Sequence, residues 1–249
     1  MKKILFFFLT LFVLGSCADE VIYNTSAKSE LQSNQQFSYD SVTNPNVWKT
    51  FMTFEEMMNA TQIPEDILKS IPTDTLVALC INHPMANSYI FYNNNLNGAM
   101  SVMERFNGFQ ELKRRKDTGV KLIDYYENIE IDYNETERNR NPYSCYRTEI
   151  KPFKVGISEL IIASKKIEDV YSDKNIDRLE RVVNKKHEEK LNNKKYNNLS
   201  ALGHSLLIGA QIKMKKTGEN KQLNQFIDRG GDIRTLNELT EISKIIYTK

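Results

Sequence analysis

The sequence predicts an all-α protein, arranged as an irregular helical bundle or as an α-α solenoid of short amphipathic helices. Apolar residues recur every three or four positions through most of residues 50–249, helix-capping residues separate these stretches, and the joins are short. No clean fixed-period repeat is present, so no named repeat family follows. Hydrophobic residues make up 40% of the chain, with only 6 Pro and 10 Gly, which excludes whole-chain disorder and low-complexity fibres.

Residues 1–16 are predicted to be a secretory signal peptide. Lys2 and Lys3 supply positive charge, and the run from Ile4 to Leu14 that follows is almost entirely apolar. As a helix this run rises about 16 Å, roughly half of a bilayer's hydrocarbon core, so it is too short to span a membrane. A short apolar run behind positive charge is typical of an export signal.

The end of this run, Leu14-Gly15-Ser16-Cys17, resembles a bacterial lipobox. In lipoproteins with this motif the cysteine sulfur receives a diacylglyceryl group, and cleavage exposes an amine that takes a further acyl chain such as palmitate. Several chains, at about 0.8 kcal/mol per buried methylene, give durable anchoring where one chain would be marginal. The resemblance implies that Cys17 is the lipidation site and that the protein binds a membrane through this anchor.

Two features after Cys17 bear on which membrane this is. Position 18 is Ala18 rather than Asp, so the usual inner-membrane retention signal is absent. Asp19 and Glu20 form an acidic pair that resembles a surface-export signal described in lipoproteins of one Gram-negative phylum. The expected location is the outer membrane, lipid-anchored and facing the cell exterior, with its periplasmic face as the alternative.

Residues 17–49 are predicted to be a flexible tether. Ser, Thr, Asn and Gln dominate residues 24–46, and apolar periodicity disappears there. Such a stretch cannot bury enough apolar surface to offset its ordering entropy. As a coil of roughly thirty residues it would reach on the order of 30 Å, enough to hold a folded body away from the lipid.

Residues 50–130 are predicted as an N-terminal helical part made of short helices. The run Thr53–Glu56 has the form of a capping box and opens the first of them. Pro64 suits the first position of the next helix, and Thr73 can cap a third helix that Pro84 ends. Further apolar positions keep helical spacing, with a break near Gly119: Leu96, Met100, Met103, Phe106, Phe109, Leu112, then Val120, Ile123 and Tyr126.

Residues 154–249 are predicted as a C-terminal helical part with longer helices. Gly230-Gly231 is expected to form a helix C-terminal cap, and Asp232 the N-cap of the last helix. Small side chains at Ala201, Gly203, Ser205 and Gly209 would allow neighbouring helices to approach closely. The apolar stripes are Ile157, Leu160, Ile161, Ile167, Val170; Ile176, Leu179, Val182, Val183, Leu191; Leu199, Leu202, Leu206, Ala210, Met214; and Ile233, Leu236, Leu239, Ile242, Ile246.

Residues 131–153 are expected to connect these two parts. Alternating polar and apolar residues at 129–133 and 146–150 would suit a small β-hairpin near 129–150, although a plain connecting loop is the favoured interpretation. Cys145 lies in this segment. A disulfide between Cys80 and Cys145 would contribute about 3–4 kcal/mol, and two free thiols are the favoured alternative.

The stretch from Phe51 to about Tyr126 resembles a segment found in uncharacterised predicted surface lipoproteins. No activity is assigned to that family, so the resemblance implies a helical, exported and anchored protein without adding chemistry. His83 stands where the family would have an aromatic residue. The residues that carry the resemblance are Gln62–Glu65, Thr73–Leu79, Cys80–Pro84, Phe106–Gly108 and Glu111–Asp117.

Motifs for metal, nucleotide or nucleophilic chemistry are absent from the sequence. The three histidines, His83, His187 and His204, are isolated from one another, without zinc-site spacing, so no metal and no cofactor is expected. His187 lies among charged residues and is expected on a solvated helix face, and His204 is expected as a hydrogen-bonded core histidine. Ser205 adjoins His204, but neighbours on a helix point about 100° apart and do not form a dyad.

The candidate contact residues are Tyr133, Tyr143 and Tyr146 in the connecting segment. Exposed tyrosines can stack on sugar rings or anchor a protein interface, and arginines at 138, 140 and 147 accompany them. A buried seam beneath a long loop would explain the same tyrosines. No catalytic residue is assigned, because glycosidase carboxylates come from distant segments and cannot be recognised by spacing.

The sequence therefore favours a non-enzymatic, membrane-anchored interaction module that binds an envelope protein. A surface glycan- or peptide-binding lipoprotein and an envelope hydrolase are the alternatives. Nucleic acid is not an expected partner, since loss of Lys2 and Lys3 with the signal peptide lowers the 34 basic groups to 32, equal to the 32 acidic groups.

Overall fold

The computed structural model describes residues 37–131, 151–194 and 196–248. These residues belong to one unit, Phe37–Lys249, which is distinct from Met1–Gln36. They form helices and no strand, which confirms the all-α class. Among the described residues, no helix combines the length and the apolar character needed to cross a bilayer.

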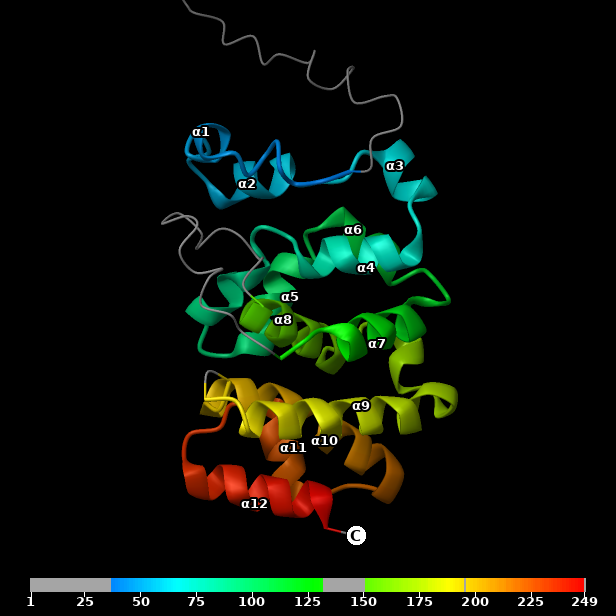
Figure 1. Ribbon diagram of the computed structural model, residues 1–249, viewed down its shortest axis with the longest axis vertical. Coiled ribbons are helices and arrows are strands. Elements are labelled where there is room, and N and C mark those ends of the chain that lie inside the picture. Colours follow the sequence, from blue (N-terminus) through cyan, green and yellow to red (C-terminus); the bar gives the residue numbers. More distant parts are fainter. Residues whose placement is uncertain (1–36, 132–150, 195, 249) are drawn as a thin grey trace, which may run out of the picture. The chain divides into compact units, whose positions relative to one another are not determined.

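The N-terminal part of this unit consists of short helices and the C-terminal part of longer ones (Figure 1). Two of the elements, η2 and η5, are 3₁₀ helices. The elements in chain order are α1 (Pro45–Trp48), α2 (Phe54–Ala60), α3 (Glu65–Ser70), α4 (Thr73–Ile81), η2 (Ala86–Phe91), α5 (Asn95–Met103), α6 (Asn107–Leu112), α7 (Thr118–Asn128), α8 (Lys151–Ala163), η5 (Glu168–Tyr171), α9 (Asp173–Leu191), α10 (Leu199–Thr217), α11 (Lys221–Asp228) and α12 (Leu236–Tyr247).

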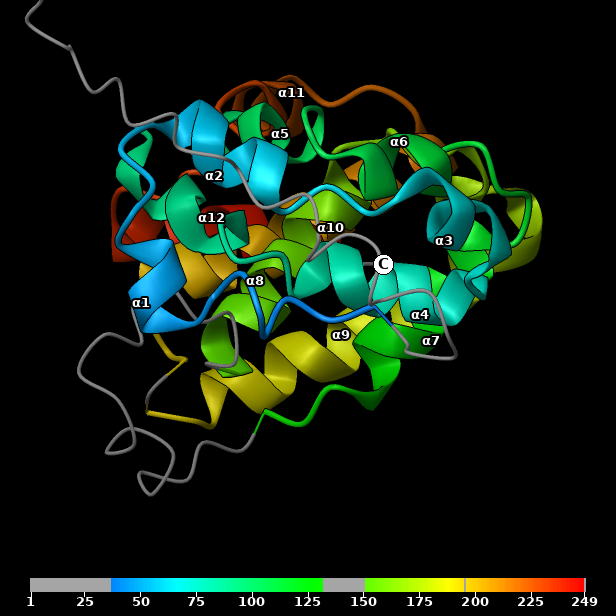
Figure 2. The ribbon, with the colours of Figure 1, turned by 90° about the horizontal axis from the view of Figure 1, so that it is seen from above.

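Helices α8 and α10 hold the unit together. α8 packs against α5, α7 and α10, while α10 also packs against α9, α11 and α12. Figure 2 shows α8 and α10 among the helices that surround them. Every residue of α10 from Leu202 to Ile212 is buried, so this part of the helix is covered on all sides rather than along one stripe.

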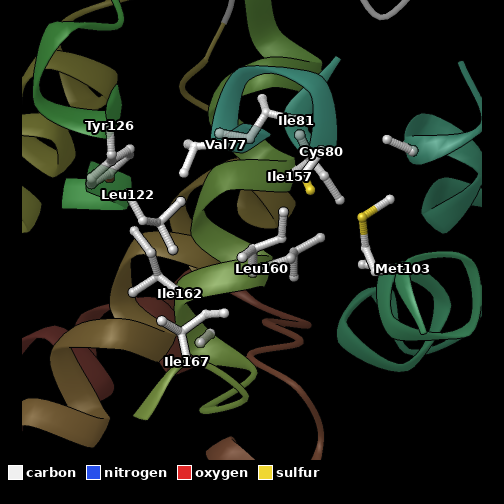
Figure 3. Packing of buried hydrophobic residues seen from close by; sticks show 14 of the residues in the cluster. Val77, Cys80, Ile81, Met103, Leu122, Tyr126, Ile157, Leu160, Ile162 and Ile167 are labelled. Carbon is white, nitrogen blue, oxygen red and sulfur yellow. The ribbon is translucent and has the colours of Figure 1, made fainter. Parts of the chain in front are cut away.

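A continuous apolar core joins the two parts of the unit. Figure 3 shows Val77, Cys80 and Ile81 of α4 facing side chains of α7 and α8. Cys80 is a free thiol, and burial raises its pKa. Its proposed partner Cys145 lies outside the described residues. The other labelled side chains are Met103 of α5, Leu122 and Tyr126 of α7, Ile157, Leu160 and Ile162 of α8, and Ile167 just before η5.

Local sequence signals place several helix ends as expected. The Thr53 hydroxyl accepts from the Glu56 backbone amide and the Glu56 carboxylate accepts from the Thr53 amide, which completes the capping box of α2. Gly230 and Gly231 take positive φ values of 67° and 80° after α11, and the Gly231 amide donates to the Phe226 carbonyl. Both helix boundaries therefore follow from local hydrogen bonding.

Two other predicted helix caps are wrong, one because of a tertiary contact and the other because a later residue caps the helix. Thr73 is the first residue of α4 rather than its cap, since its hydroxyl donates to the Asp117 carboxylate 2.9 Å away. Asp232 does not cap α12; Thr235 does, and its hydroxyl accepts from the Glu238 amide. Residues 232–234 therefore lie outside α12, with Ile233 buried.

Glycines set two close approaches between elements. Gly119 is the second residue of α7, just after the break between α6 and α7, and its amide donates to the Asp169 carboxylate in η5. A Cβ on Gly203 of α10 would lie 2.3 Å from the Gly231 carbonyl oxygen, so only glycine permits this contact. The small residues of α10 thus allow close packing, as their side-chain size predicts.

The folded unit starts earlier than the predicted tether boundary at residue 49. Tyr39 and Trp48 are buried, and the Tyr39 hydroxyl donates to the Leu79 carbonyl oxygen in α4. Two aromatic side chains supply enough apolar surface to fix this polar stretch on the core. Similarly, α8 begins at Lys151, inside the predicted connection 131–153. The suggested hairpin lies outside the described residues except for 129–131, which form no strand.

Candidate functional site

A cavity of about 190 Å³ lies between η2, α8, α9 and the start of α10. It is called the His204 cavity below. Its mouth includes the exposed residues Ile90, Asn198 and Ser200, and its inner surface consists of buried residues. The full lining is Tyr89, Ile90, Phe153, Val155, Gly156, Glu159, Lys190, Tyr196, Asn198, Ser200, Ala201 and His204.

Gly156 of α8 lies at a tight point of the His204 cavity. A Cβ built on this glycine would lie 2.5 Å from the Tyr89 hydroxyl oxygen and 3.5 Å from His204 Nδ1. The Tyr89 and His204 rings meet edge to face with centroids 5.8 Å apart. An alanine at 156 would therefore collide with the Tyr89 hydroxyl, so the glycine allows Tyr89 to pack this closely on α8.

A buried ion pair lies on the inner surface of the cavity. Lys190 Nζ of α9 donates to both carboxylate oxygens of Glu159 on α8, at 2.6 and 2.5 Å, and to the Ala201 carbonyl oxygen at 2.6 Å. The Tyr126 hydroxyl of α7 donates to the same carboxylate at 2.5 Å. These contacts use all three ammonium protons of Lys190, so this lysine has no proton left for a further acceptor.

Burial and attraction act in opposite directions on this pair. Burial raises the pKa of Glu159 and lowers the pKa of Lys190, because a low-dielectric interior disfavours both charged forms. Their mutual attraction and hydrogen bonds oppose both shifts. Whichever group holds the shared proton, the net charge of the pair is zero.

His204 of α10 presents an unpaired nitrogen to the cavity. Its Nε2 lies 3.1 Å from the Asn95 side-chain nitrogen, which can only donate, so Nε2 accepts and the imidazole proton is on Nδ1. Among the described residues, Nδ1 has no hydrogen-bond partner although it is buried. Asn95 also donates to the Ser200 hydroxyl at 3.0 Å, so its amide bridges Ser200 and His204.

Burial keeps His204 neutral. It lowers the pKa of His204 to about 3, and the charge of Lys190 adds to this effect. Burial also raises the pKa of the Tyr89 hydroxyl, which stays protonated. At neutral pH the inner surface of the cavity therefore offers two uncharged donors, the Nδ1–H of His204 and the hydroxyl of Tyr89.

An exposed apolar segment, Ile90-Phe91-Tyr92, borders the cavity mouth and is called the rim segment. The exposed fractions are 48% for Ile90, 85% for Phe91 and 44% for Tyr92. Ile90 also lines the cavity, so the exposed apolar surface continues into it. The Tyr92 ring packs on Gly98 of α5, whose Cβ would lie 2.7 Å from that ring. Three consecutive exposed apolar side chains are unusual on a solvated surface.

The other two histidines are buried away from the cavity. The charged neighbours of His187 predict a solvated helix face, and this prediction is wrong, because the residue is buried. Its Nδ1 lies 2.8 Å from the Ser205 hydroxyl of α10, and its ring contacts Tyr247 of α12. Ser205 donates to the Leu202 carbonyl, so His187 is the donor in their hydrogen bond. With Ser205 fully buried, this pair is structural rather than a catalytic dyad.

A second, open depression of about 530 Å³ collects carboxylates and lysines. Asp74, Asp124 and Glu130 line it with Lys121 and Lys154. Asp124 is already paired with Arg178 of α9 at 2.6 Å. Across the described ranges, no group of three or more His, Cys, Asp or Glu side chains is placed to hold a metal ion.

The structure does not describe the contact residues or the lipidation site that the sequence predicts. Tyr133, Tyr143, Tyr146 and the lipidation site Cys17 lie outside the described residues. The cavity residues escaped sequence analysis because they come from four separated segments. Polar residues within apolar stretches could have indicated the site: Glu159 lies among the apolar residues of α8, and His204 lies in the helix with small residues.

Comparisons with known proteins give no relative for this chain. No protein-family model, no curated protein and no solved structure matches it.

Proposed function

We propose that the protein is a lipid-anchored binding module whose rim segment and His204 cavity hold a protein partner in the cell envelope. The observation that carries the proposal is the continuity of the exposed rim segment with the cavity through Ile90. Protein interfaces concentrate their binding energy in aromatic and aliphatic anchors beside desolvated pockets. Phe91 is such an anchor, and the cavity is such a pocket for a side chain of the partner.

The proposed anchor is the acylated Cys17, with the polar stretch after it as the tether. An outer-membrane location, facing outward or toward the periplasm, fits Ala18 and the Asp19-Glu20 pair. Anchoring confines the protein to two dimensions and raises its effective concentration beside other envelope proteins. A modest cavity and a short rim segment would then suffice for binding.

Catalysis is not the favoured use of the cavity. Among the described lining residues, Glu159 is the one carboxylate, and Lys190 and Tyr126 already occupy it. Ser200 accepts from Asn95, and its hydroxyl has no carboxylate or histidine assigned as a base. The depression around Asp74 and Asp124 is the place to test the hydrolase alternative, since it gathers acidic groups in one hollow.

Glycan binding is a second candidate, favoured by a small polar pocket on the other side of His204. Asn93, Asn95, Ser200 and Asp232 line it, close in sequence to the exposed Phe91 and Tyr92. Amide and carboxylate groups beside an exposed aromatic ring suit a sugar, which stacks its apolar face and hydrogen-bonds its hydroxyls.

The test is site-specific photo-crosslinking in cells, with a crosslinking amino acid at Phe91. The matched control places it at Leu236, which is 70% exposed on α12 and does not line the cavity. The proposal expects one protein to crosslink at Phe91 and not at Leu236, and this product to disappear with Cys17→Ala. Equal crosslinking at both positions, or none at Phe91, contradicts it, and glycan arrays with the Phe91→Ala variant would then test the second candidate.

A further inference from the structure

We infer that the His204 cavity binds an apolar group carrying one neutral carbonyl oxygen, which accepts hydrogen bonds from His204 Nδ1–H and from the Tyr89 hydroxyl. This inference rests on the proposed binding function and names the chemistry that the partner must present. It starts from His204 itself, which lines the cavity and whose Nδ1–H is buried without a partner among the described residues. A buried N–H without an acceptor weakens a fold, so a ligand that supplies one is favoured.

The acceptor must be neutral because the cavity offers no free positive charge. The charges of Glu159 and Lys190 cancel, and the three protons of Lys190 are held by Glu159 and the Ala201 carbonyl oxygen. His204 is uncharged at neutral pH, because burial lowers its pKa to about 3. A carboxylate or phosphate brought into this site would lose its hydration without gaining a counter-charge.

A carbonyl fits the two donors better than a hydroxyl does. The Tyr89 oxygen and His204 Nδ1 lie 2.5 and 3.5 Å from a single point at Gly156, so the two groups are no more than about 6 Å apart. A carbonyl oxygen placed between them can accept from both with its two lone pairs and has no proton of its own to place. A ligand hydroxyl would also need an acceptor for its own proton, and the Glu159 carboxylate already accepts from Tyr126 and twice from Lys190.

The rest of the lining selects an apolar group about the size of a six-membered ring. Ile90, Phe153 and Val155 contribute apolar surface between the mouth and the two donors. A dry apolar cavity of about 150 Å³ binds benzene, so a cavity of about 190 Å³ accommodates a ring with one substituent atom. Cyclohexanone matches this size and carries one carbonyl oxygen.

The test compares cyclohexanone with methylenecyclohexane, which has the same shape and replaces the carbonyl oxygen with a CH₂ group. Both are titrated against the full-length acylated protein in lipid nanodiscs, with empty nanodiscs as the blank. The measured quantity is the ratio of the two affinities, compared between wild type and His204→Phe. This comparison cancels the different solubilities of the two compounds in water and lipid. We expect the ratio to favour cyclohexanone five- to tenfold more in the wild type.

Two further variants keep the test decisive. His83→Phe removes another buried histidine, outside the cavity, and should leave the wild-type ratio unchanged. Gly156→Ala places a methyl group 2.5 Å from the Tyr89 hydroxyl oxygen and so displaces one of the two donors, which should lower the preference for cyclohexanone even if His204→Phe does not fold. Equal ratios in wild type and His204→Phe would overturn the inference, as would an undiminished preference in Gly156→Ala.

Absence of cyclohexanone binding to the wild type would also overturn the inference and leave a buried water as the partner of His204. The crosslink at Phe91 reports on the proposed function separately. A specific crosslink together with a failed carbonyl test refutes only the carbonyl, whereas loss of the crosslink refutes the protein-binding role itself.

Discussion

His83 and His204 occupy comparable environments in two different regions of the molecule, yet only one of them marks a site. Both are buried, and burial lowers the pKa of each to about 3. His83 has both nitrogens satisfied, since Nε2 lies 2.9 Å from the Thr61 hydroxyl and Nδ1 accepts from the Met85 amide. His204 has one nitrogen satisfied and one directed at a cavity.

The difference shows that burial and a shifted pKa do not by themselves identify a functional residue. At His83 the Thr61 hydroxyl donates to the Met58 carbonyl, so its oxygen accepts from Nε2–H and the network closes. At His204 the network ends at the cavity. An open hydrogen-bond network beside empty space is a more specific sign of a ligand than either property alone.

The largest expected effect is a loss of stability in acid, to which His83 and His204 contribute equally. Burial lowers the pKa of His83, His187 and His204 to about 3, 4 and 3. The unfolded chain binds protons near pH 6.5 and the folded chain does not, so stability is present above that pH and is lost as the pH falls. Three histidines should reduce the unfolding free energy by about 4 kcal/mol per pH unit between pH 6 and 5.

Denaturant titrations at several pH values measure this slope, and His83→Phe should reduce it by about one third. A slope that is unaffected by His83→Phe would mean that this histidine is not neutral in the folded state. His204→Phe should reduce the slope by a similar amount, because the two pKa values are shifted equally.

The second effect concerns the ion pair beside His204, which has no counterpart at His83. Lys190→Met leaves the Glu159 carboxylate buried without its cation, and the unfolding free energy should fall by about 3–5 kcal/mol at neutral pH. The double variant Lys190→Met with Glu159→Leu should recover most of this loss, since an apolar pair removes the buried charge. Equilibrium unfolding of both variants checks this; a double variant as unstable as the single one would show that the pair fixes the helix packing itself.

The smallest effect separates the two histidines directly. His83→Phe leaves the buried Met85 amide without an acceptor and should destabilise the protein by about 1–3 kcal/mol. His204→Phe should cost less than about 1 kcal/mol, because Asn95 keeps its hydrogen bond to Ser200. Paired unfolding curves at neutral pH measure both. Equal losses would mean that His204 contributes to the fold as much as His83 does, which argues against its Nδ1 being unpaired.

The helices and several of their ends were predictable because local patterns determine them. The capping box at Thr53 and the glycine pair at 230–231 need only neighbouring residues, and both form as predicted. Thr73 failed as a cap because Asp117, far along the chain, binds its hydroxyl, whereas Asp232 failed because Thr235 caps α12 instead. Helix boundaries set by tertiary hydrogen bonds leave no local trace.

The candidate site was much less predictable. His187 and Lys190 lie in a run of charged residues on α9, which predicts a solvated face, yet both are buried by α10 and its neighbours. Their burial depends on Ser205 and Ala201 arriving from the next helix. Similarly, the cavity requires η2, α8, α9 and α10 to meet, and no single segment carries that information.

Gly156, which lines the His204 cavity, limits which residues can replace it. It lies inside α8, where alanine would favour the helix by about 1 kcal/mol. A methyl group there would lie 2.5 Å from the Tyr89 hydroxyl oxygen, so it could be accommodated only if Tyr89 moved. A lineage that keeps Tyr89 at the cavity therefore has to keep glycine at this position and to tolerate the weaker helix that comes with it.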